Sequence, residues 1–287
     1  MPAHILDGRA LAAELREGLA ARSAVLRSAG VDPRLVVVLV GSDPSSEAYV
    51  KTIAGVGKRV GVTVDVDALP EAAGDGEIRD RLVRRGADPS VHGILLQQPL
   101  PAGRSIRVIA DAVPAHKDVD GTNPLNQGRL AFGSGADFVP ATPAAVMLLL
   151  ERSAKWPLRG RDATVVGRSA VVGLPVSLLL IAQGATVTVA HRATTDLAAH
   201  VRRADVLVVA AGVPGLIGAE WIKPGATIVD VGTTVRDGAL VGDVDYAPAA
   251  EVAGEITPVP GGVGPVTNVA LLRNVVTAAE RANAGTL

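Results

Sequence analysis

The segment from Ala163 to Pro175 combines small residues with two glycines, Gly167 and Gly173, in a spacing that suits phosphate binding. An apolar run precedes Gly167, and an apolar segment of helical length follows Gly173. A strand that enters a helix through such a turn lets backbone N–H groups and the positive end of the helix dipole face a pyrophosphate. The spacing departs from the G-x-G-x-x-G pattern, so the prediction of a dinucleotide site depends on its surroundings.

Three further strand-like runs follow, at residues 185–190, 206–210 and 227–231. Helical or turn-rich segments separate them, a pattern that predicts a Rossmann-like, doubly wound parallel sheet with ligand-binding loops at the carboxyl ends of its strands. Gly212 and Thr233 follow the second and third of these runs closely, so we expect both of them near the ligand.

The end of the run 185–190 bears on which dinucleotide binds. NAD sites usually place an Asp or Glu there for the ribose hydroxyls. This chain instead has Arg192, and a second arginine, Arg168, lies in the glycine turn. Two guanidinium groups suit a 2′-phosphate, so the sequence favours NADP over NAD. The alternative is that both arginines are ordinary solvated loop residues.

Composition excludes several classes of protein. The chain has 287 residues, a formal net charge of −1, and only two Phe, two Tyr and two Trp, which disfavours a nucleic-acid partner. It has no cysteine, and its five histidines lack metal-ligand spacing, so we expect neither disulfides nor a metal site. No leader-like or membrane-length apolar segment stands out, so we expect a soluble, cytoplasmic protein without a membrane partner.

The amino-terminal half also alternates helix and strand, which predicts a second α/β domain. Expected helices cover residues 9–28, 45–60 and 77–85, and expected strands cover 34–40, 63–68 and 91–96. Thr142 and Pro143 are typical of an N-cap followed by the first residue of a helix that ends near Arg152. A last helix is expected at about residues 267–283, returning to the first domain.

Three motifs occur in a fixed order along nearly the whole chain: Lys-Asp-Val-Asp-Gly at 117–121, Gly-Arg-Ser at 167–169, and Pro-Gly-Gly-Val-Gly-Pro at 260–265. With them the chain resembles the methylenetetrahydrofolate dehydrogenase/cyclohydrolase family, the bifunctional FolD-type enzymes of one-carbon metabolism. The resemblance implies two α/β domains with an interdomain cleft that binds folate, NADP on the second domain, and a homodimer. We expect a folate domain at 1–144, an NADP-binding domain at 145–264 and a returning helix at 265–287.

The resemblance also implies roles for individual residues. Tyr49 borders the pterin, Asp120 hydrogen-bonds the pterin ring, and Gln97 lies beside the one-carbon unit; these form the expected catalytic set. Gly261 and Gly262 let the backbone approach the substrate. The expected cofactor-binding residues are Gly167, Arg168, Ser169, Gly173, Pro175, Arg192, Gly212 and Thr233. Without the resemblance, the residue types favour a turn role for Asp118 and Asp120 over a metal-binding pair, a solvated strand end for Gln97 and an ordinary amphipathic helix position for Tyr49.

One position departs from the family. The family's active-site lysine lies four residues after the tyrosine, and here that residue is Ile53. Lys51 and Lys58 lie on other faces of the expected helix, at about 100° per residue. In the family this lysine serves mainly the cyclohydrolase reaction, so the resemblance implies a dehydrogenase whose cyclohydrolase activity is weak or lost. Two alternatives remain open: an NADPH-dependent reductase of another C=N substrate, and a non-catalytic folate- or nucleotide-binding subunit.

Overall fold

The computed structural model describes residues 2–285, and its chain divides into two compact units. Unit 1 comprises residues 2–12 and 142–267, and unit 2 comprises residues 13–141 and 268–285. The first twelve residues group with unit 1 because strand β1 (His4–Ile5) pairs with β11 (Glu255–Ile256), whereas the sequence placed them with the folate domain.

The sheet of unit 1 is parallel throughout and has the strand order β1-β11-β8-β7-β5-β6. Its four longer strands are β5 (Asp162–Val166), β6 (Thr186–Ala190), β7 (Val206–Val209) and β8 (Thr227–Asp230). Strands β6, β7 and β8 fall within the predicted runs, and β5 begins one residue before the predicted Ala163. The doubly wound sheet is confirmed. Strands β1 and β11 were not predicted, because two residues carry no recognisable alternation.

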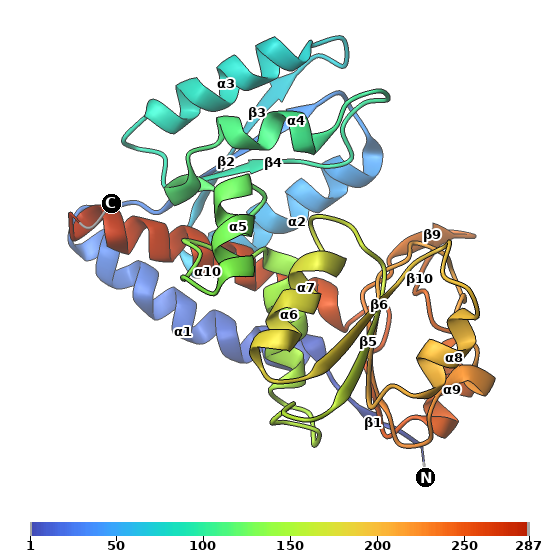
Figure 1. Ribbon diagram of the computed structural model, residues 1–287. Helices are drawn as coiled ribbons and strands as arrows, with labels where there is room; N and C mark the ends of the chain where they lie inside the picture. Colours follow the sequence, from blue (N-terminus) through green and yellow to red (C-terminus); the bar gives the residue numbers. More distant parts are fainter. Residues whose placement is uncertain (1, 286–287) are drawn as a thin grey trace. The chain divides into compact units, whose positions relative to one another are not determined.

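Helices lie on both faces of this sheet. Figure 1 shows α7 (Gly173–Ala182) on one side, and α8 (Leu197–Arg202) and α9 (Tyr246–Val252) on the other. A buried apolar cluster in unit 1 includes Val209 of β7, Ile228 of β8 and Ala249 of α9. The short helix η3 (Ala219–Trp221) lies between β7 and β8 in the sequence.

Helix α6 (Ala141–Leu150) begins one residue before the predicted cap, so the assignment of Thr142 as N-cap was wrong. The backbone N–H of Ala141 donates to the Asp120 carboxylate. An acceptor from another segment therefore serves this helix start, and a capping side chain at position 142 is not needed.

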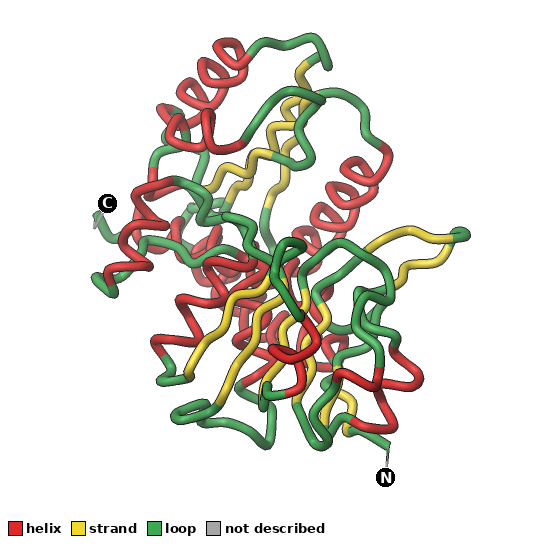
Figure 2. The backbone as a smooth tube through the Cα atoms, turned by 45° about the vertical axis from the view of Figure 1, so that its right-hand side comes forward, coloured by secondary structure: helices red, strands yellow, loops and turns green. Residues whose placement is uncertain are grey.

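A two-stranded antiparallel hairpin, β9 (Thr234–Arg236) and β10 (Ala239–Val241), follows β8. Asp237 and Gly238 form its turn with positive φ angles of 52° and 77°, as a two-residue hairpin loop requires. Figure 2 shows the hairpin as a narrow ribbon separate from the main sheet. Its cross-strand pair, Val235 and Leu240, is exposed. The hairpin therefore has no buried face, and the sequence shows no alternation of buried apolar and exposed polar residues from which these two strands could be predicted.

Unit 2 contains a three-stranded parallel sheet of order β3-β2-β4. Its strands are β2 (Arg34–Val40), β3 (Thr63–Leu69) and β4 (Gly93–Leu96). The helices and short helical turns that lie wholly or mostly in unit 2 are α1 (Gly8–Ser28), α2 (Pro44–Val60), α3 (Asp75–Ala87), α4 (Ile106–Ile109), η1 (Ala110–Ala112), η2 (Ala115–Lys117), α5 (Pro124–Phe132) and α10 (Val263–Asn283). Apart from α10, the elements that were predicted have bounds within two residues of the prediction, whereas α4, η1, η2 and α5 were not predicted.

Helix α10 is an exception, because it begins at Val263 rather than near Thr267. Pro265 is the third residue of this helix, where proline is tolerated because the backbone N–H groups of a first turn need no intrahelical partner. The Thr267 hydroxyl donates to the Val263 carbonyl at 3.2 Å, which places Thr267 inside the helix.

Both faces of the unit 2 sheet are covered. Figure 1 shows α3 and α4 on one face and α2 on the other. Val36 and Val38 of β2 pack with Ile78 and Leu82 of α3 in one buried cluster. Helices α1 and α10 lie side by side, joined by the ion pair of Arg22 and Glu280 at 2.6 Å. No helix among residues 2–285 is long and apolar enough to cross a membrane.

Candidate functional site

The segment from Gly167 to Gly173, here called the phosphate turn, joins β5 to α7. Gly167 has a φ of 136°, and a Cβ atom there would collide with the Ala210 carbonyl. A Cβ on Gly173 would collide with the Gly167 carbonyl. Both positions therefore require glycine, and the backbone closes into a tight loop at the carboxyl end of β5.

Ser169 organises this turn internally. Its hydroxyl accepts from the backbone N–H groups of Val172, at 3.1 Å, and Gly173, at 3.4 Å. Pro175 is buried in the first turn of α7, where it withholds no needed donor. The helix of ten residues therefore begins directly behind a loop of small residues, and this cradle fits an anionic phosphate group.

Arg168 and Arg192 are exposed at the ends of neighbouring strands. Arg168 follows β5 and Arg192 follows β6, and the Gly167 N–H donates to the Ala190 carbonyl at 2.8 Å, which joins the two strand ends. Within residues 2–285, neither guanidinium group has a hydrogen bond or an ion pair. Both are available to an anion bound over the phosphate turn.

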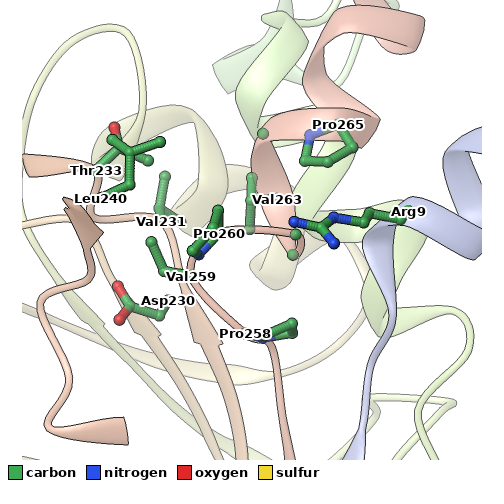
Figure 3. A pocket seen from close by; sticks show the side chains of 13 residues that line it. Arg9, Asp230, Val231, Thr233, Leu240, Pro258, Val259, Pro260, Val263 and Pro265 are labelled. Carbon is green, nitrogen blue, oxygen red and sulfur yellow. The ribbon is translucent and has the colours of Figure 1, made fainter. Parts of the chain in front are cut away.

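A pocket in unit 1 lies beyond the carboxyl ends of β8 and β11. Figure 3 shows Thr233, Leu240 and Pro260 around it, with the Asp230 carboxylate across the pocket from Arg9. The complete lining is Arg9, Asp230, Val231, Thr233, Leu240 and residues 258–265. The predicted residues Thr233, Gly261 and Gly262 thus meet in one pocket of mainly apolar character, which suits a flat ring.

The glycine pair in this pocket is held by close packing. Gly261 has a φ of 116°, and a Cβ on Gly262 would collide with the Pro258 carbonyl and the Thr257 side chain. From the other side, a Cβ on Gly8 would collide with the Gly262 carbonyl. No side chain fits between these backbones, so the glycines are required by the fold as well as by any ligand.

Tyr49 of α2 and Asp120 come together in unit 2. Burial raises the pKa of the Asp120 carboxyl to about 7, and the nearby Asp118 charge adds to this effect. Burial and the charge of Asp120 both raise the pKa of Tyr49, which keeps its hydroxyl protonated. A protonated phenol beside a carboxyl that titrates near neutrality is an arrangement capable of hydrogen bonding and proton exchange.

Gln97 is buried at the carboxyl end of β4, at the same edge of the sheet as the start of α2. Its side-chain amide donates to the Gln98 carbonyl at 2.5 Å, and the Ser46 hydroxyl of α2 donates to the same carbonyl at 3.4 Å. These bonds tie the end of β4 to the first turn of α2, the helix that carries Tyr49.

Asp118 holds the segment that carries Asp120. Its carboxylate accepts from the Asn123 backbone N–H at 2.8 Å, the Asn126 side-chain amide at 2.9 Å and the Thr122 N–H at 3.0 Å. Burial nevertheless raises the Asp118 pKa to about 6. Asp118 is thus a loop-organising residue whose charge also reaches Asp120.

Ile53 lies one helical turn after Tyr49 on α2 and has no exposed surface. Lys51 and Lys58 of the same helix are exposed. The amine of Lys117, which is buried, donates to the Asp88 carbonyl at 2.6 Å. An apolar side chain therefore occupies position 53, and these three amines are directed elsewhere.

Comparison with known sequences assigns both parts of the chain. Residues 6–120 match the catalytic domain of tetrahydrofolate dehydrogenase/cyclohydrolase, and residues 140–283 match its NAD(P)-binding domain. The chain belongs to the tetrahydrofolate dehydrogenase/cyclohydrolase family. The family resemblance seen in the sequence is confirmed, and so is the expectation of a nicotinamide dinucleotide cofactor.

Individual relatives match over almost their full length. The bifunctional protein FolD of Chloroflexus aggregans is 50% identical over 281 residues, which are 97% of this chain and 98% of the relative. The FolD crystal structure from Campylobacter jejuni has a TM-score of 0.94 and 40% identity, covering 97% of this chain and 99% of that one. FolD of Trypanosoma brucei, complexed with NADP and an inhibitor, has a TM-score of 0.93 and 37% identity, covering 98% of each chain.

Of the residues that line the unit 1 pocket, only Thr233, Gly261 and Gly262 were predicted as site residues. Among those missed are Arg9, Asp230 and Leu240, and Arg9 lies more than 200 residues before the other two. Asp230 could have been noticed, since it is an acidic residue at the end of a predicted apolar strand. Arg9 and Leu240 carried no signal, because the pairing of β1 and the hairpin that bring them to the pocket were not predicted.

Proposed function

We propose that this protein is an NADP-dependent 5,10-methylenetetrahydrofolate dehydrogenase with weak or absent methenyltetrahydrofolate cyclohydrolase activity. Membership of the family and the phosphate turn support the dehydrogenase reaction. The buried isoleucine at position 53 is the observation that carries the second part of the proposal. The relatives are named as bifunctional FolD proteins, so the proposed loss of cyclohydrolase activity is a difference from them.

Unit 1 residues would hold the cofactor. The phosphate turn would bind the pyrophosphate through its backbone N–H groups, and Arg168 and Arg192 would bind the 2′-phosphate. The pocket around Thr233 and Gly261 would hold the nicotinamide ring. When bound, NADP accepts a hydride from the methylene carbon, which leaves the methenyl cation of the folate.

Unit 2 residues would hold the folate. A pterin presents N–H donors that the Asp120 carboxylate can accept, and Tyr49 would border the ring. Gln97 would lie beside the one-carbon unit. Hydride transfer asks mainly for alignment, because the folate nitrogens themselves activate the methylene carbon.

The hydrolytic step makes a different demand. Water must attack the methenyl carbon, and a proton must leave that water as the bond forms. Isoleucine can neither donate a hydrogen bond nor carry a charge, so position 53 can assist neither event. Loss of this one side chain therefore affects hydrolysis far more than hydride transfer.

Two separate assays test the proposal. Methylenetetrahydrofolate with NADP, followed at the nicotinamide absorbance, should show turnover, whereas purified methenyltetrahydrofolate should disappear no faster than it does in buffer. Rapid enzymatic hydrolysis would refute the role given to Ile53. Bound NADP without turnover of methylenetetrahydrofolate would instead favour a different C=N substrate or a non-catalytic subunit.

A gain-of-function variant sharpens the test. Ile53→Lys should raise the hydrolysis rate at least tenfold, and Ile53→Met, which is similar in volume but uncharged, should not. Far-UV circular dichroism would show that both variants are folded. A folded Ile53→Lys protein without added hydrolysis would mean that position 53 does not control this step.

We also propose that the protein forms a homodimer through unit 2. Among the described residues, 2–285, strand β3 is an edge strand that pairs only with β2, and Val66 on it is 51% exposed. An open, partly apolar edge is a template for pairing with a second chain. Light scattering of the wild-type protein should give a mass of two chains. The Val66→Lys variant should give the mass of one chain. A monomeric wild-type protein would refute this proposal.

A further inference from the structure

Two buried carboxylates in unit 1, Asp230 and Asp243, have been given no role above, although Asp230 lines the unit 1 pocket. Their exposed fractions are 4% and 0%. Within residues 2–285, neither forms an ion pair with a lysine, arginine or histidine. Buried charges without a cation are costly unless other donors replace water, so their retention calls for a specific arrangement of donors.

Backbone N–H groups supply these donors. Asp230 accepts from Gly232 at 2.9 Å, from Asp243 at 3.1 Å and from Val244 at 3.0 Å. Asp243 accepts through one oxygen, Oδ2, from Ala211 at 2.7 Å and from Gly212 at 2.8 Å. The donors come from three segments, which follow β7, β8 and β10. The two side chains, here called the carboxylate clamp, thus join loops that are distant in sequence.

The surrounding backbone is shaped to these two side chains. A Cβ on Gly232 would collide with the Asp243 carboxylate, and a Cβ on Gly242 would collide with the Asp230 carboxylate. The second oxygen of Asp243, Oδ1, is buried against Gly232 without a hydrogen-bond partner. Such close contact leaves the loops little freedom to shift while both carboxylates are in place.

The segments joined by the clamp carry predicted cofactor residues. Gly212 donates directly to Asp243, and Thr233 follows Gly232, which donates to Asp230. Thr233 and Asp230 also line the unit 1 pocket, together with Leu240 of the hairpin that leads to Asp243 (Figure 3). The clamp therefore sets the relative positions of the loops on which the pocket depends.

We propose that Asp230 and Asp243 are positioning residues for the dinucleotide, which preorganise the loops after β7 and β8 for its nicotinamide half. This inference rests on the proposed cofactor site of unit 1 and is independent of the folate reaction. Asp243 acts through the backbone of Ala211 and Gly212, and Asp230 acts through that of Gly232. Neither carboxylate needs to touch the ligand for this role.

Cofactor binding to the folded protein tests the proposal. Asp243→Ala should raise the Kd for NADP about tenfold, which corresponds to about 1.4 kcal/mol. Asp243→Asn keeps one side-chain acceptor for the two N–H groups and should recover most of the affinity. In turnover assays the KM for NADP should rise while the KM for the folate stays the same.

Glu255 provides a matched control. It is a buried carboxylate of the same sheet, at the amino end of β11, and it accepts from the Ala154 N–H at 2.8 Å and the Thr227 hydroxyl at 2.6 Å. Glu255→Gln should lower the melting temperature but leave the Kd for NADP unchanged. This variant separates a loss of stability from a loss of cofactor positioning.

The outcomes are distinct. If Asp243→Ala does not fold, Asp230→Asn offers the same measurement at the partner carboxylate. Folded clamp variants that bind NADP as tightly as the wild type would overturn the proposal, and so would an equal loss of affinity in Glu255→Gln. A wild-type protein that does not bind NADP at all would instead refute the proposed function.

Discussion

The phosphate turn of unit 1 depends on backbone groups, whereas the Tyr49–Asp120 site of unit 2 depends on side chains. In the turn, glycines stand where a side chain would collide with the backbone, and the expected ligand contacts are backbone N–H groups. In unit 2 the expected contacts come from side chains, and a neighbouring position holds a fully buried isoleucine without loss of the helix. A site built from backbone N–H groups can be altered only by altering the fold around it. A site built from side chains can lose or gain a chemical function through one substitution while the fold stays the same.

The strongest test of the backbone site is Gly173→Ala. The added methyl group must displace the Gly167 carbonyl, so we expect NADP affinity to fall at least 100-fold, as titration calorimetry would measure. Gly128→Ala on α5 is the control, because apart from adjacent residues and the backbone of its own helix no atom lies within 4 Å of its Cβ position. This variant should increase stability by about 0.5–1 kcal/mol. Unchanged NADP binding in Gly173→Ala would contradict the role of the turn.

Ile53→Lys tests how much stability the protein loses when a charged side chain replaces the buried isoleucine. Because position 53 has no exposed surface, we expect the new ammonium group to lower the free energy of unfolding by about 3–5 kcal/mol relative to Ile53→Met. Urea denaturation at pH 7 measures the difference. A cost below about 1 kcal/mol would contradict the prediction that position 53 is too deeply buried to accept a charge without a large loss of stability.

Asp120→Asn tests the electrostatics of unit 2. The folded-state pKa of Asp120, about 7, lies above the ordinary value of 3.8, so folding favours its protonated form. Stability that is present below pH 4 is therefore lost as the pH rises towards 7, with a slope of up to about 1.4 kcal/mol per pH unit. Burial also raises the pKa values of Asp118 and Asp230, each to about 6, so these carboxyls contribute a slope of the same sign below pH 6. Asp120→Asn should therefore remove the Asp120 share of the slope, which denaturation series from pH 4 to pH 7 would show most clearly between pH 6 and pH 7.

Asp80→Asn on α3 is the control for that series, since it removes one exposed negative charge from the same unit. It should leave the pH dependence of the wild type in place. An unaltered slope in Asp120→Asn would mean that Asp120 is charged throughout this range.

The smallest effect is expected at the arginines that flank the phosphate turn. Arg192→Gln should raise the Kd for NADP about tenfold and leave NAD binding unchanged, because only NADP carries the 2′-phosphate. Arg161→Gln, an exposed arginine just before the amino end of β5, should change neither. Equal losses for NADP and NAD would show that Arg192 serves the pyrophosphate instead.

Local patterns were enough to predict the longer elements. The apolar runs at β2, β5 and β8 and the amphipathic α1 follow directly from residue periodicity, which is a short-range property of the chain. The phosphate turn was also predictable, because strand, glycines and helix are contiguous. The family motifs identified Tyr49, Gln97 and Asp120 as candidates, although periodicity gave them no special status.

Contacts between distant segments were beyond these patterns. Strand β1 has two residues and acquires its place only by pairing with β11, which brings Arg9 to a pocket formed by residues more than 200 positions later. The carboxylate clamp likewise depends on Asp243 meeting the loop after β7. Hydrogen bonds and burial at such sites arise from the packed chain, because the energy of a buried charge is set by neighbours that no local pattern specifies.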